Sequence, residues 1–143
     1  MARAAVLLAL VGAAVGCGDG TRAVIAIATP PELVSTFDEF VEFIPTSGLT
    51  VVATDEARPA AMYRVDVVTD LAGCSECYRV DPIAGDDRGW VVHASDRLGA
   101  QYGVAEVFEL LGYRFRHPFD TYAPARPQPD PAALARLGGV HEP

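Results

Sequence analysis

One helical pattern, in residues 95–115, carries glycines where a helix does not favour them. Ser95 or Asp96 can cap its start, and apolar side chains recur on one face. The apolar positions are Ala100, Val104, Val107, Phe108 and Leu111. Gly99 and Gly103 each cost the helix about 1 kcal/mol relative to Ala. Their presence therefore predicts that the helix backbone lies very close to a sheet or to another domain.

The end of this helix is marked by Gly112, which follows the last periodic residue and predicts a left-handed cap. Residues 113–118 then read as a short extended strand. The tail, residues 119–143, is rich in proline and has only a short helical pattern at 131–137. The tail is therefore predicted to be a linker or the truncated start of a following domain.

A strand and a second amphipathic helix precede this pattern. Residues 24–27 form a short aliphatic run. Thr29 is followed by Pro30, at the expected first helical position, and Glu32 lies three residues after Thr29, which is the spacing of a capping box. The apolar face of this helix is predicted to comprise Leu33, Phe37, Phe40, Val41 and Ile44. Residues 45–48 end the helix, and residues 49–53 are predicted to form the next strand.

Three further strands are predicted, over residues 61–70, 76–83 and 89–95. Tyr63, Val65 and Val67 alternate with polar residues, so the first of these strands should have one buried face and one wetter face. Residues 84–89 read as a turn, which predicts an antiparallel hairpin between the last two strands. The predicted fold is α+β, with a mixed or antiparallel sheet of about five strands backed by two amphipathic helices.

The N-terminal residues 1–16 have the form of an export signal. A charge at Arg3 precedes a run of apolar and small residues that is too short for a permanent transmembrane helix. Residues 14–17, Ala-Val-Gly-Cys, resemble the bacterial lipobox. This resemblance implies cleavage before Cys17, lipidation of that cysteine and a membrane-anchored lipoprotein of the bacterial cell envelope. The alternatives are an ordinary signal peptide of a secreted or periplasmic protein, or a short buried helix.

Two cysteines, Cys74 and Cys77, remain if Cys17 is lipidated. An exported protein meets oxidising conditions, in which such a pair can close as a disulfide. Half a zinc site or a redox centre is the alternative. However, the chain has no second Cys-x-x-Cys, its histidines show no ligand spacing, and the residues after Cys77 read as a strand and not as a helix. We expect a structural disulfide or plain thiols, with no metal and no cofactor.

The charge of the chain argues against a nucleic-acid partner. Nineteen acidic residues outnumber eleven basic ones, and the basic residues are scattered singly. The sequence also lacks a phosphate-binding loop and a dinucleotide-binding fingerprint. A chain of 143 residues is long enough for one domain with one core, which we place at residues 22–118.

Several motifs occur in a fixed order over residues 76–118. They are a Glu-x-Tyr strand, a strand ending in a small residue and Asp, a Gly-Ala-x-Tyr-Gly helix, and Leu-Gly-x-Arg leading to Pro. The matching positions are Glu76, Tyr78, Asp96, Gly99, Ala100, Tyr102, Gly103, Leu111, Gly112, Arg114 and Pro118. In this order the chain resembles the N-terminal accessory domain of family-20 beta-N-acetylhexosaminidases and family-67 alpha-glucuronidases. The resemblance implies a zincin-like layer, a sheet backed by two helices, without metal and without catalysis.

In those families the acid–base chemistry belongs to a following (beta/alpha)8 barrel, where two carboxyl groups lie across the sugar. The chain stops at about the point where such a barrel would begin, and it has no counterpart of the carboxylate pair. Asp86 and Asp87 are expected to be an exposed turn, His93 a structural histidine of a strand, and His117 a loop residue.

The resemblance implies a non-catalytic accessory domain of a cell-envelope glycoside hydrolase, separated from its catalytic barrel. Gly99, Tyr102, Gly103 and Arg114 are the candidates for packing within the domain or against its neighbour. The alternative is a free-standing envelope lipoprotein that binds glycan or a partner protein, and a single-domain enzyme is third. The expected partners are the membrane, through the lipid anchor, and a catalytic barrel or glycan.

Overall fold

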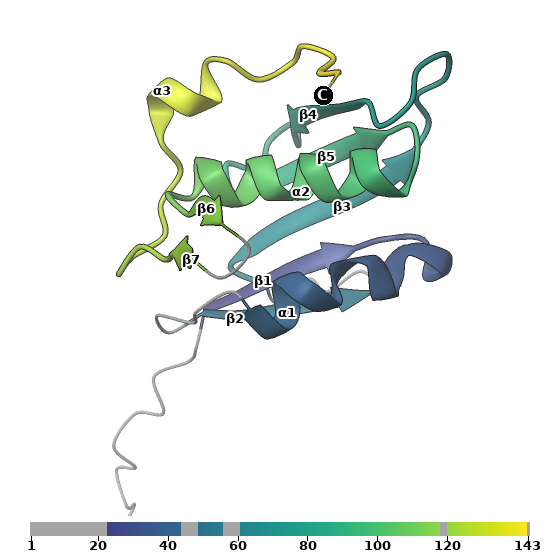
Figure 1. Cartoon of the computed structure of the whole chain (residues 1–143). Helices are drawn as coiled ribbons and strands as arrows, with labels where there is room; N and C mark the ends of the chain where they lie inside the picture. Colours follow the sequence, from purple (N-terminus) through teal and green to yellow (C-terminus); the bar gives the residue numbers. More distant parts are fainter. Residues whose placement is uncertain (1–22, 44–48, 56–60, 118–119, 143) are drawn as a thin grey trace, which may run out of the picture.

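The computed structural model describes residues 23–43, 49–55, 61–117 and 120–142 (Figure 1). The elements of its main sheet are β1 (Ala23–Ala28), β2 (Leu49–Thr54), β3 (Tyr63–Thr69), β4 (Tyr78–Pro82) and β5 (Gly89–Ala94). The remaining elements are the 3-10 helix η1 (Pro31–Phe37), helices α1 (Asp38–Phe43), α2 (Arg97–Leu110) and α3 (Pro131–Leu134), and the strands β6 (Arg114–His117) and β7 (Asp120–Tyr122). The α+β fold and the five-stranded sheet backed by helices are therefore confirmed.

The sheet has the order β2-β1-β3-β5-β4. The pairs β1–β2, β1–β3 and β3–β5 are parallel, and only β4 runs antiparallel to its neighbour β5. The predicted hairpin between β4 and β5 is thus confirmed. Because β4 is an edge strand, it can hold Pro82, which cannot donate a hydrogen bond to a further strand.

Both helical segments cover the same face of the sheet (Figure 1). Successive side chains of a strand point to opposite faces, and in β3 the residues Tyr63, Val65 and Val67 are buried as predicted. The rings of Phe40 and Phe108 stack with centroids 5.6 Å apart, so the two helical segments share one core. The largest fully buried side chains are Trp90, Tyr113, Phe37, Phe108, Ile25, Ile27 and Leu111.

Helix α2 begins and ends where the sequence predicts. The side chain of Asp96 accepts a hydrogen bond from the amide of Gly99, which caps the N-terminus. At the other end Gly112 has φ of 94°, and its amide donates to the carbonyl of Glu109. The amide of Tyr113 reaches back to Phe108, which completes the Schellman arrangement of hydrogen bonds.

The start of the first helical segment differs from the prediction. Thr29 does not cap it: Pro30 occupies the cap position with φ −51° and ψ 144°, and no side chain closes the end. The reason is Pro31, because a residue before proline is pushed out of helical backbone geometry. Pro30 is therefore extended, and Thr29 lies one residue too far out to reach the first amides.

The apolar face of this segment is also shorter than predicted. Leu33 and Phe37 are buried, whereas Val41 is 40% exposed. Residues 31–37 form a 3-10 helix of about three residues per turn, so the later residues are rotated away from the positions that an α-helix would give them. Ile44 and residues 45–48 lie outside the described part of the chain.

The tail that reads as a linker lies along the domain. The amide of Asp130 donates to Leu110 at 2.9 Å, and the hydroxyl of Tyr63 donates to the carbonyl of Pro127 at 2.8 Å. His141 forms a single antiparallel bridge with Tyr78 on the outer edge of β4. Figure 1 shows the segment after α3 returning toward β4.

Candidate functional site

Several residues of the motif in residues 76–118 form a junction between the loop before β4, the end of β5 and the start of α2. The carboxylate of Asp96 accepts hydrogen bonds from the amides of Glu76, at 2.7 Å, and Gly99, at 3.0 Å. These hydrogen bonds hold the pKa of Asp96 below its usual value, and the one from Gly99 has a larger effect than the one from Glu76. Ser95 adds a hydrogen bond from the amide of Cys77 to its hydroxyl, at 2.9 Å. The junction fixes the loop before β4 to the start of the helix.

The two helix glycines lie where α2 touches the sheet. A Cβ atom on Gly99 would overlap the carbonyl oxygen of Cys77, and one on Gly103 would overlap Cγ1 of Val92. Both glycines are buried. The predicted close approach of the helix to the sheet is confirmed at these two positions.

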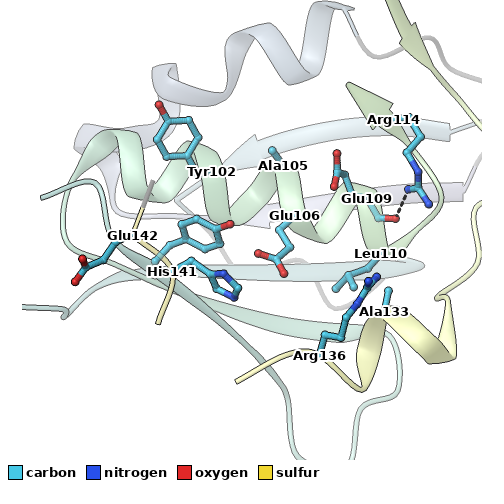
Figure 2. A pocket seen from close by; sticks show the side chains of 11 residues that line it. Tyr102, Ala105, Glu106, Glu109, Leu110, Arg114, Ala133, Arg136, His141 and Glu142 are labelled. Atoms are coloured by element: carbon cyan, nitrogen blue, oxygen red, sulfur yellow. Dashed lines mark hydrogen bonds between the residues drawn. The ribbon is translucent and has the colours of Figure 1, made fainter. Parts of the chain in front are cut away.

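The other two packing candidates, Tyr102 and Arg114, point to a different place. Both line a surface groove of about 700 Å³ between α2 and the C-terminal segment (Figure 2). Tyr102 is 40% exposed. The guanidinium of Arg114 donates to the backbone carbonyls of Glu109 and Tyr113, so it also closes the C-terminal end of α2.

Aromatic rings form one end of this groove. The rings of Tyr78 and His141 stack with centroids 5.1 Å apart and an angle of 14° between their planes. Tyr102 lies 6.5 Å from Tyr78 at a tilt of 48°. Burial raises the pKa of the Tyr78 hydroxyl far above its usual value, and a hydrogen bond with Glu106 and the negative charges of Glu106 and Glu109 act in the same direction.

Charged side chains line the rest of the groove. Figure 2 shows Glu106 and Glu109 on the α2 side, with Arg136 opposite them beside Ala133. Within the described part of the chain, none of these three charged groups makes an ion pair. Sequence reasoning missed the groove, because Tyr78 and His141 come together only when the tail folds back on β4.

Cys74 and Cys77 form a disulfide that closes the loop before β4. Cys77 is fully buried, and its carbonyl accepts a hydrogen bond from the amide of Ser95 at 3.0 Å. In the part of the chain that the structure describes, no group of three His, Cys, Asp or Glu side chains is arranged to hold a metal ion. Cys17 and the predicted signal lie outside the described residues.

His93 has two acidic neighbours on the sheet face away from the helices. Its Nδ1 lies 2.8 Å from a carboxylate oxygen of Asp70, and its Nε2 lies 3.4 Å from Asp81. Asp81 also accepts a hydrogen bond from Arg79. Both ring nitrogens of His93 thus lie beside carboxylate groups, which fix the orientation of the imidazole.

The remaining acid–base candidates are Asp86, Asp87 and His117, which lie in a turn and at the end of a strand. Asp86 lies in the turn between β4 and β5, where its carboxylate accepts a hydrogen bond from the amide of Arg88. Asp87 is exposed in the same turn, as expected, whereas His117 is the last residue of β6 and not a loop residue. Asp86 and Asp87 are consecutive residues of one turn, and neither of them lines the groove.

Comparisons of the chain with protein-family models and with curated proteins gave no match. Among the described helices, none is both long enough and apolar enough to cross a membrane.

Proposed function

We propose that the chain is a non-catalytic accessory domain of a cell-envelope glycoside hydrolase. The observation that carries this proposal is the use of the motif residues in the fold. Asp96 joins the loop before β4 to α2, and Gly99 and Gly103 let the helix lie directly on the sheet. A motif that holds elements together supports a scaffold role and not a reactive centre.

The surroundings of the acid–base candidates support the same proposal. Hydrolysis of a glycosidic bond needs a proton donor and a second carboxylate across the scissile bond. His93 lies between Asp70 and Asp81 on the sheet surface, and Asp86 and Asp87 share a turn. A catalytic barrel would supply the paired carboxylates, and this domain would contribute stability and placement.

Two measurements test the proposal. The purified chain should release no nitrophenol from nitrophenyl N-acetylglucosaminide or glucuronide, while it unfolds cooperatively in urea. Reading the adjacent coding region in all frames should find a (beta/alpha)8 barrel. Turnover that disappears in Asp86→Asn, Asp87→Asn or His93→Ala would contradict the non-catalytic role, and a coding region without a barrel would contradict the accessory role.

The second candidate function is a free-standing envelope lipoprotein that binds glycan or a partner protein. The groove favours it, since the exposed ring of Tyr102 and the carboxylates of Glu106 and Glu109 line the same surface feature. In both cases we propose a lipid anchor on Cys17. The protein should then partition into membrane fractions, and Cys17→Ser should release it or leave it unprocessed. Mass spectrometry showing an unmodified mature Cys17 would rule out the anchor.

A further inference from the structure

We propose that the groove between α2 and the C-terminal segment is a binding site for a neutral saccharide. The groove measures about 700 Å³, which is within the range of about 300 to 1,000 Å³ that is typical of ligand sites. Figure 2 shows its lining side chains following α2 on one side and the C-terminal segment on the other. This shape suits a short oligosaccharide that lies along the surface.

The aromatic end of the groove supplies a surface for the apolar side of a sugar ring. Tyr102 is 40% exposed, so part of its ring is free for contact. Tyr78 is held in place by the stacked ring of His141 and by the backbone bridge between the same two residues, whose hydrogen bonds are 2.8 and 3.1 Å long. Rigid aromatic side chains give contact area with little loss of conformational entropy.

The polar wall of the groove supplies both kinds of hydrogen-bonding group. The carboxylates of Glu106 and Glu109 are acceptors, and the guanidinium of Arg136 is a donor. None of them makes an ion pair among the described residues. Glu106 already shares a hydrogen bond with the Tyr78 hydroxyl, but a carboxylate has further lone pairs with which it can accept from a ligand. A sugar hydroxyl both donates and accepts, and therefore fits a wall that mixes the two.

The charges of the groove favour a neutral ligand over an ionic one. The lining of the groove includes three carboxylates, from Glu106, Glu109 and Glu142, and two guanidinium groups, from Arg114 and Arg136. A phosphate or a uronate would meet the glutamates, and an ammonium group would meet the arginines, at an unfavourable Coulomb energy. Hydroxyl groups escape this conflict and can still form charge-assisted hydrogen bonds with either type.

The saccharide site deepens the proposed role in carbohydrate processing and rests on it. The two can still fail separately. The accessory role is decided by the adjacent coding region and by the absence of hydrolysis, whereas the saccharide site is decided by binding to the purified chain.

The experiment is a titration of the isotopically labelled full chain, followed by NMR. The probes are the neutral trisaccharides chitotriose, cellotriose and xylotriose, with glucosamine and glucuronic acid as charged comparisons. We expect saturable shifts of amide signals along α2 and at His141 with at least one neutral probe. Tyr102→Ala and Glu106→Gln should each weaken that binding by about tenfold or more, through loss of ring contact and of a charged acceptor.

Two substitutions serve as controls. Tyr122→Ala removes another exposed tyrosine, in β7, and Asp87→Asn removes an exposed carboxylate in the β4–β5 turn; neither residue lines the groove. Both should bind the neutral probe like the unsubstituted chain. Absence of shifts with all three neutral probes, binding of the charged probes alone, or equal losses in the control variants would overturn the proposal.

Discussion

The two helical segments that cover the sheet begin in different ways, although both carry a capping pattern in the sequence. Asp96 caps α2 by accepting a hydrogen bond from the amide of Gly99, and it also accepts one from the amide of Glu76 in the loop before β4. In the first segment Thr29 does not reach the helix, and its buried hydroxyl has no hydrogen-bond partner within the described residues. A capping residue therefore acts only where the backbone after it can enter the helix, and Pro31 prevents this by keeping Pro30 extended.

The two segments also differ in how closely they approach the sheet. Gly99 and Gly103 bring the backbone of α2 onto β4 and β5. The first segment has larger residues, Leu33 and Phe37, at buried positions and leaves Val41 partly exposed. Substitutions should therefore affect stability more strongly in α2 than in the first segment. Four pairs of substitutions probe α2 and its surroundings, and two of these pairs compare it directly with the first segment.

The largest difference is expected for truncation of an apolar side chain. Leu111, at the end of α2, is 1% exposed, and Val41 is 40% exposed. Leu111→Ala should lower the free energy of unfolding by about 2 to 5 kcal/mol because it leaves a cavity, whereas Val41→Ala should change it by less than about 0.5 kcal/mol. Urea denaturation measures both, and equal losses would contradict the difference in burial.

The second comparison concerns the close contact of α2. Helix propensity alone predicts that Gly99→Ala stabilises the protein by about 1 kcal/mol. The overlap of the new Cβ with the carbonyl oxygen of Cys77 should instead destabilise it, by about 1 to 3 kcal/mol. Gly139→Ala is the control, because a Cβ there meets no atom within 4 Å. A stabilised Gly99→Ala variant would show that the helix does not lie so close to the sheet.

The third comparison concerns the two capping residues. Asp96→Ala should cost about 1 to 2 kcal/mol, whereas Thr29→Val removes an unpaired hydroxyl and should cost nothing. Because the pKa of Asp96 is lowered in the folded state, its carboxylate contributes fully above about pH 4 and less as the pH falls. The difference between Asp96→Ala and the unsubstituted chain should therefore shrink in acid. Denaturant unfolding at pH 7 and pH 3 checks this, and a constant difference would argue against the ionised cap.

The smallest effect is expected just after α2. The hydroxyl of Tyr113 is buried and has no hydrogen-bond partner in the described part of the chain, so Tyr113→Phe should leave stability near pH 7 unchanged or slightly higher. Burial, and then the charge of Tyr63, raise the pKa of Tyr113 to about 12. Ionisation of Tyr113 is therefore disfavoured in the folded protein. The contribution of this group to the free energy of unfolding is fully present below pH 10 and is lost as the pH rises toward 12.

Tyr113→Phe should reduce the loss of stability at alkaline pH, because the variant has no hydroxyl to ionise at this position. Tyr63→Phe is the matched variant, since it removes the hydrogen bond to Pro127 and should cost about 0.5 to 1.5 kcal/mol at neutral pH. Thermal unfolding followed from pH 7 to pH 11 compares the two variants. A large loss in Tyr113→Phe at neutral pH would show that its hydroxyl has a partner.

Local patterns were enough to predict most of the elements. The alternation in β3, the apolar stripe of α2 and the cap residues Asp96 and Gly112 depend on neighbours a few residues away. The α+β class and the β4–β5 hairpin follow from such elements in order. The exception near Thr29 is also local, because Pro31 decides the backbone of Pro30 and moves the start of the helix.

By itself the sequence thus determined where most strands and helices lie and which of their faces are apolar. Only the tertiary structure decided that β1 lies between β2 and β3, that Asp70 and Asp81 meet His93, and that the tail brings His141 onto Tyr78. Propensity and periodicity act over a turn of helix or a few strand residues. Contacts between distant segments instead depend on the register of the whole sheet and on which surfaces can be buried together, and the groove of α2 arises from such contacts.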